Sequence, residues 1–190
     1  MQRTGSEAAE QVEAADLGAP VERDTRTKER ALDPALRLQN ALDMAFRYLG
    51  PRARTEVEMR RYLEGKRVEP ETIEQALTSL REQDYLNDVR FAREFSEDKR
   101  LLEEWGADRI ERRLLALGVP IGIVREAVGA RGRDDEREAA MALVRRRFPA
   151  LENDPRELKR AIGVLARKGY DSELAWDVVR AHARGGDVFD

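Results

Sequence analysis

Apolar residues recur with the spacing of amphipathic helices along most of the chain after residue 34. In the segment LQNALDMAFRYLG they fall three and four residues apart, which places them on one face of a helix. Two later segments carry helix-start signals: Thr55 with Glu58 forms a capping box, and Pro70 suits a first helical turn. The pattern predicts helices and no convincing strand. The expected helices are 35–49, 56–65, 70–83, 88–104, 107–117, 121–130, 134–148, 155–168 and 172–183.

The apolar pattern repeats when the sequence is shifted by 51 residues. Two of the aligned columns are Met59, Ile110 and Ala161, and Leu63, Leu114 and Leu165. A further column contains Gly118 and Gly169, which are typical of a left-handed residue at a helix end, but its first member is Arg67. We therefore expect the turn of the first unit to differ. The repeat predicts an all-α protein, an elongated tandem array of three three-helix repeats in the manner of a short helical solenoid.

The repeat divides the chain into segments with different expected structures. The middle unit should have a longer first helix with an apolar face of Phe91, Phe95 and Leu102. The predicted segments are a mostly disordered extension (1–34), repeats at 35–87, 88–133 and 134–184, and a flexible tail (185–190).

Composition narrows the possible functions. The chain is 38% charged and has no cysteine, which excludes disulfides and thiolate metal sites. His182 is the single histidine, and there is neither a G-x-S-x-G nor a nucleotide-binding P-loop motif. No apolar run has the length of a membrane span. We expect a soluble, cytoplasmic, monomeric protein that is not an enzyme and needs no cofactor.

Charge is unevenly distributed along the chain. Residues 1–34 hold five basic and eight acidic side chains (5 − 8 = −3), whereas residues 131–184 hold thirteen basic and ten acidic ones (13 − 10 = +3). A cationic surface can contact phosphates or an acidic protein surface, although an ordinary arginine-rich surface would look the same. The candidate contact residues are Arg109, Arg112, Arg113, Arg145, Arg146, Lys159, Arg160, Arg167 and Lys168.

The stretch DYLNDVRFAREF, residues 84–95, could be read as a catalytic carboxylate beside an aromatic pocket. Helix capping explains it better, because Asn87 is a good N-cap and Asp88 in the first turn favours the helix dipole. We expect Phe91 and Phe95 to pack between the first and second units.

The same stretch resembles a family signature. The residues concerned are Tyr85, Leu86, Asn87 and Asp88, then Arg90, Phe91 and Ala92, and then Gly106, Arg109, Ile110, Leu114 and Gly118, with LARKGY at 165–170. From about residue 36 to 184 the chain is similar to the bacterial RecX family. The resemblance implies a regulator that binds the RecA filament on single-stranded DNA and inhibits its ATP hydrolysis and strand exchange, and with them the SOS response. The alternative is a stand-alone helical protein that binds nucleic acid.

Overall fold

The structure, a computed structural model, describes residues 33–50 and 52–186. All regular elements in this part of the chain are helices, so the predicted all-α fold is confirmed. They are α2 (Pro34–Leu49), α3 (Glu56–Gly65), α4 (Pro70–Glu82), α5 (Asp88–Glu103), α6 (Ala107–Ala116), α7 (Ile121–Gly129), α8 (Arg133–Arg147), α9 (Pro155–Lys168) and α10 (Ser172–Gly186). The expected extension and tail lie outside the described residues, except that Asp33 caps α2 and α10 continues to Gly186.

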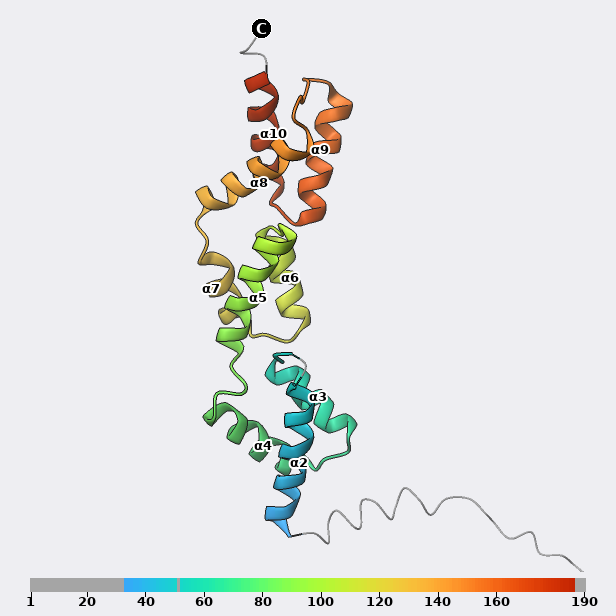
Figure 1. The fold of residues 1–190 in the computed structure, drawn as a ribbon, viewed down its shortest axis with the longest axis vertical. Coiled ribbons are helices and arrows are strands. Elements are labelled where there is room, and N and C mark those ends of the chain that lie inside the picture. Colours follow the sequence, from blue (N-terminus) through green and yellow to red (C-terminus); the bar gives the residue numbers. More distant parts are fainter. Residues whose placement is uncertain (1–32, 51, 187–190) are drawn as a thin grey trace, which may run out of the picture.

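The helices form three groups that follow one another along the long axis of the molecule (Figure 1). In each group the third helix packs against both of the others, α4 on α2 and α3, α7 on α5 and α6, and α10 on α8 and α9. Each group has its own cluster of buried apolar side chains. Each of these clusters is small by itself, so contacts between the units are needed to complete the fold.

Local signals explain where the helices begin. Thr55 and Glu58 form the predicted capping box at the start of α3. The Asn87 side chain accepts a hydrogen bond from the Arg90 backbone N–H at 2.9 Å, which confirms it as the N-cap of α5. Asp154 caps α9 in the same way, directly before Pro155. Such caps satisfy N–H groups that have no partner within the helix.

The first helix of the middle unit is not longer than the others, as we expected it to be, because α5 and α2 both have 16 residues and α8 has 15. Of its expected apolar face, Phe91 and Phe95 are confirmed and Leu102 is not. Phe91 and Phe95 stack on each other with ring centroids 5.9 Å apart. Both pack against the core of the second unit, so the expectation that they lie between the first and second units is wrong. Leu102 is 80% exposed and takes no part in that core. The helix turns this residue outward shortly before it ends at Glu103.

The first and second units meet end to end through α3 and α6. The Thr55 hydroxyl at the start of α3 donates a hydrogen bond to the Leu117 carbonyl after α6, at 2.7 Å. The Asp88 carboxylate, in the first turn of α5, accepts a hydrogen bond from the Glu56 N–H at 3.0 Å. The second unit thus supplies partners for the beginning of α3.

The second and third units meet in the same way through α6 and α9. The Gly106 N–H donates to the Lys168 carbonyl at 2.9 Å, and the Asp108 N–H donates to the Gly169 carbonyl at 3.1 Å. Gly106 lies 51 residues after Thr55, and Lys168 lies 51 residues after Leu117. The sequence repeat is therefore also a repeat of this end-to-end contact between units, which we call a joint.

A carboxylate completes the second joint as Asp88 completes the first. Glu136, in the first turn of α8, accepts a hydrogen bond from the Ala107 N–H at 2.7 Å. Ala107 is the repeat equivalent of Glu56. In both joints, the first helix of one unit therefore caps the second helix of the unit before it.

Close approach at these joints explains two of the glycines. A Cβ on Gly118 would lie 2.5 Å from the Val57 Cβ, and one on Gly169 would lie 2.6 Å from the Arg109 backbone nitrogen. Both glycines have φ of 86°, and Arg67 has φ of 63°. The expectation that the first unit's turn differs is therefore wrong, because Arg67 adopts the same left-handed conformation. Within the described residues, no further unit precedes the first one to crowd this side chain.

Candidate anion-binding surface

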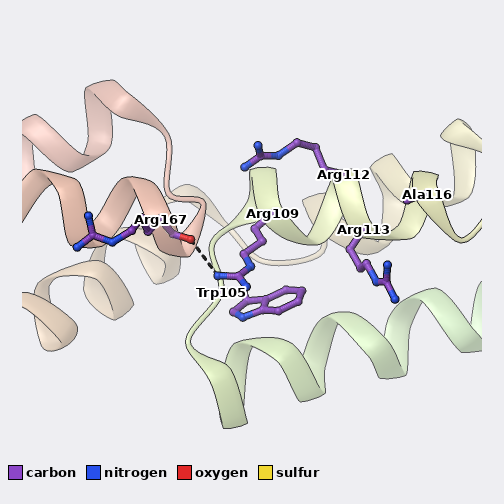
Figure 2. A pocket seen from close by; sticks show the side chains of 6 residues that line it. All are labelled: Trp105, Arg109, Arg112, Arg113, Ala116 and Arg167. Atoms are coloured by element: carbon purple, nitrogen blue, oxygen red, sulfur yellow. Dashed lines mark hydrogen bonds between the residues drawn. The ribbon is translucent and has the colours of Figure 1, made fainter.

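Arg109, the first of the predicted contact residues, is held in the joint between α6 and α9. Its Nη1 donates to the Arg167 carbonyl at 2.9 Å (Figure 2). Its guanidinium also lies over the Trp105 ring, 4.1 Å from the ring centroid, in a cation–π contact. The hydrogen bond connects the second unit to the third, and the cation–π contact within the second unit fixes the side chain in that position, so Arg109 has a structural role here.

Lys168 and Arg146 belong to the same joint. The Lys168 ammonium donates to the Glu103 carbonyl at 2.6 Å, and it lies 4.0 Å from the Glu104 carboxylate. Arg146 forms an ion pair with that same Glu104 carboxylate. These predicted contact residues therefore have partners within the chain.

Arg112 and Arg113 face an open hollow of about 610 Å³. They extend from α6 in different directions, and both are exposed (Figure 2). The Arg112 Nε donates to the Asp108 carbonyl at 3.1 Å, which leaves the rest of its guanidinium outward. Neither arginine forms an ion pair within residues 33–50 and 52–186. The lining of this α6 hollow consists of Trp105, Arg109, Arg112, Arg113, Ala116 and Arg167.

A second hollow, of about 710 Å³, lies along α9 and the end of α8. The lining of this α9 hollow consists of Arg147, Phe148, Arg156, Lys159, Arg160, Gly163, Val164 and Arg167. Its lining includes no acidic residue. Arg167 lines both hollows, so the α6 and α9 hollows adjoin at the joint. The structure thus brings Arg112, Arg113, Lys159, Arg160 and Arg167 onto one cationic surface.

Arg145 lies apart from this surface. It lines a third hollow on α8, where Asp134 and Glu138 are among its neighbours. Two residues of the α9 hollow, Arg147 and Arg156, were absent from the predicted set. Helical spacing could have indicated Arg156, which precedes the Lys159–Arg160 pair by one turn.

Buried titratable groups lie at the joints and not in the hollows. Burial raises the pKa of the Asp88 carboxyl and raises that of Tyr170 to about 12. Burial also lowers the pKa of Arg100, whose Nη2 donates to the Val128 carbonyl at 2.6 Å. None of these groups lines the α6 or α9 hollow. The hollows are instead lined by arginine and lysine side chains, whose positive charge suits binding of an anion.

The described residues contain no group of three or more His, Cys, Asp or Glu side chains placed to hold a metal ion. In the same part of the chain, no helix is both long and apolar enough to cross a bilayer. The absence of a cofactor remains a prediction.

Comparison with known proteins decides the family. Sequence models of the first and third three-helix domains of RecX match residues 41–80 and 134–179. The chain is 32% identical over 155 residues to the regulatory protein RecX of Amycolatopsis mediterranei, covering 80% of this chain and 89% of that protein. This chain belongs to the RecX family. The resemblance seen in the sequence is thereby confirmed.

Other RecX proteins extend the comparison. The chain is 36% identical over 141 residues to the RecX of Deinococcus radiodurans, covering 73% of this chain and 66% of that protein. The crystal structure of RecX from Lactobacillus salivarius has a TM-score of 0.69 at 18% identity, covering 82% of this chain and 99% of the other. Another RecX crystal structure has a TM-score of 0.66 at 19% identity, with coverages of 86% and 79%. These structures show the same fold.

The residues that carried the RecX resemblance build the joints of this chain. Asn87 caps α5, and Asp88 caps α3 across the first joint. Gly118 allows the close approach of α3, while Gly106 and Arg109 contact the third unit. In this RecX protein, these motif residues therefore set the stacking of the units, and the outward cations lie beside them.

Proposed function

We propose that this chain regulates the recombinase RecA. It binds the filament that RecA forms on single-stranded DNA and inhibits ATP hydrolysis and strand exchange, and so acts on the SOS response. The observation that carries the proposal is membership of the RecX family, whose curated members are named regulatory proteins. Those names also support a role as a binding protein and not an enzyme.

The shape of the array supports binding to a filament. The second helices α3, α6 and α9 have 10, 10 and 14 residues and follow one another end to end. At a rise of 1.5 Å per residue they span roughly 50 Å. A surface of this length can contact more than one subunit of a filament.

The charge of the array supports contact with an anionic partner. The α6 and α9 hollows adjoin and are lined by arginine and lysine. Exposed cations of this kind steer the approach of an acidic protein surface or of phosphates. Of these, we propose Arg112 and Arg113 as the filament contacts on α6.

A titration of RecA activity tests the proposal. ATP hydrolysis by RecA on single-stranded DNA is followed while the purified chain is added up to the RecA concentration. We expect the rate to fall as the chain approaches stoichiometric amounts, and the chain to sediment with the filaments. An unchanged rate without co-sedimentation would refute regulation of RecA, and a faster rate would refute the inhibitory direction.

A further inference from the structure

Among the described residues, the cations of the α9 hollow differ from those of the first unit in having no acidic partners. In the first unit, Arg52 and Arg54 both pair with Glu58, and Arg60 pairs with Glu74. Within the described residues, the basic side chains lining the α9 hollow form no ion pair. The positive charge of this hollow is therefore available for an external anion.

Spacing along α9 arranges this charge as a line. Arg156, Arg160, Gly163 and Arg167 lie three or four residues apart and therefore share one face of the helix, and Lys159 lies at the edge of that face, three residues after Arg156. From the first to the last of them, the line is roughly 16 Å long at 1.5 Å per residue. Such a line matches the phosphates of one extended strand better than the two phosphate rows of a duplex.

The base of the hollow is apolar. Phe148 and Val164 are partly buried and pack against the core of the third unit, and Gly163 between the cations carries no side chain. A nucleotide chain has both anionic phosphates and apolar sugar and base faces. An acidic peptide would present mainly carboxylates, so the combination of cationic rim and apolar base favours a nucleotide chain.

We infer that the α9 hollow binds the phosphodiester backbone of single-stranded nucleic acid, and that this binding does not require RecA. Arg147, Arg156, Lys159, Arg160 and Arg167 contact phosphates, and the apolar base contacts sugars or bases. Contacts of this kind position a strand without reading its sequence. The α9 hollow adjoins the proposed filament contacts on α6 but its lining does not include Arg112 or Arg113, so substitutions can test the two proposals one at a time.

Fluorescence anisotropy of a labelled oligothymidylate of about 16 nucleotides tests the inference with the full chain and without RecA. The variant R147A/R156A/R160A removes three cations from the hollow. We expect its affinity to fall on the order of tenfold or more at low salt. Because each lost phosphate contact reduces the salt slope by about 0.7, the slope of log affinity against log salt should fall by roughly 2.

The matched control is R47A/R93A/R125A, which removes the same charge from exposed sites on α2, α5 and α7. Helicity measured by circular dichroism should match the unsubstituted chain for both variants, because all six side chains are exposed. We expect the control to keep most of the affinity and of the salt slope.

Three results would overturn the inference. The first is absence of binding to the oligonucleotide. The second is an equal loss of affinity in both variants, which would show that binding depends only on the net charge of the protein. The third is displacement of the strand by polyglutamate as effectively as by unlabelled oligothymidylate, which would assign the hollow to acidic protein segments. None of these results depends on the outcome of the RecA titration.

Discussion

The ends of α3 and α9 have the same backbone conformation and different surroundings. Arg67 after α3 and Gly169 after α9 both have positive φ, at 63° and 86°. The end of α9 is docked against the start of α6, whereas no unit in the described residues precedes α3. The conformation alone therefore tolerates an arginine, and it is the docking that requires a glycine.

This difference has a general meaning for stacked helical units. A left-handed residue at a helix end costs a side chain only about 1–2 kcal/mol. Where the preceding unit also approaches this Cα closely, as at Gly118 and Gly169, there is no space for a Cβ. Glycine at an internal joint thus reports the presence of a neighbour, and Arg67 stands at a helix end where, within residues 33–50 and 52–186, no other unit is docked.

Substitution of Gly169 should have the largest effect on the free energy of unfolding. In G169A, the new Cβ would lie 2.6 Å from the Arg109 backbone nitrogen, so the backbone of α6 must move. Because the cost of the left-handed conformation adds to the cost of overpacking, we expect a loss of about 2–5 kcal/mol in the free energy of unfolding. Urea denaturation followed by circular dichroism measures it.

The reciprocal change, R67G, is the control for this prediction. In the part of the chain that the structure describes, no docked unit crowds this position, so we expect the free energy of unfolding to stay within about 1 kcal/mol of the unsubstituted chain. A loss in R67G as large as that in G169A would show that the turn itself, and not the docking, sets the requirement.

Removal of the carboxylate cap at the second joint should have an intermediate effect. E136A leaves the Ala107 N–H without its acceptor, and we expect a loss of about 1 kcal/mol, as for other helix caps. E136Q keeps a carbonyl acceptor and should lose less than half of that. Thermal unfolding of the two variants side by side measures the difference. Equal losses would contradict a role for the hydrogen bond.

Substitution of Asp88, which caps α3 at the first joint, should have the smallest effect on the free energy of unfolding. Burial raises the pKa of Asp88, so folding favours its protonated form. Its contribution to stability is full at pH values below the unfolded pKa, about 3.9, and is lost as the pH rises through the folded pKa. The charged group is therefore unfavourable at neutral pH.

D88N removes this charge and keeps an oxygen acceptor for the Glu56 N–H. We expect D88N to be more stable than the unsubstituted chain at pH 7 by roughly a few tenths of a kcal/mol. The difference should shrink as the pH is lowered towards 4, which thermal unfolding at several pH values can follow. A difference that does not change with pH would contradict the assignment.

Local features of the sequence predicted most of the fold. The capping box at Thr55, the Asn87 cap and the prolines at 70 and 155 are signals within one turn of the helix they start. The predicted starts of α3, α4, α5, α6, α7, α9 and α10 agree with the structure to the residue. The outward turn of Leu102 was missed, because the sequence there is apolar and only packing shows which side of α5 is covered.

The joints and the cationic surface were harder to predict from the sequence. Asp88 reads as a local helix starter, and its bond to Glu56, 32 residues away, depends on how two units stack. In the run Arg145–Arg147, successive side chains point about 100° apart on the helix. Only the packing of α8 shows that Arg147 faces the α9 hollow, while Arg146 enters the joint and Arg145 points elsewhere.

The most direct test compares two repeat-equivalent arginines in the RecA assay. Arg61 on α3 and Arg112 on α6 are 51 residues apart, both are exposed, and neither forms an ion pair within the described residues. Only Arg112 lies in the adjoining hollows. We expect R112E to raise the concentration needed to inhibit ATP hydrolysis by RecA roughly tenfold, and R61E to leave it unchanged. The assignment of the filament contact to this surface would be contradicted if R61E and R112E had equal effects. It would also be contradicted if R112E inhibited at the same concentration as the unsubstituted chain.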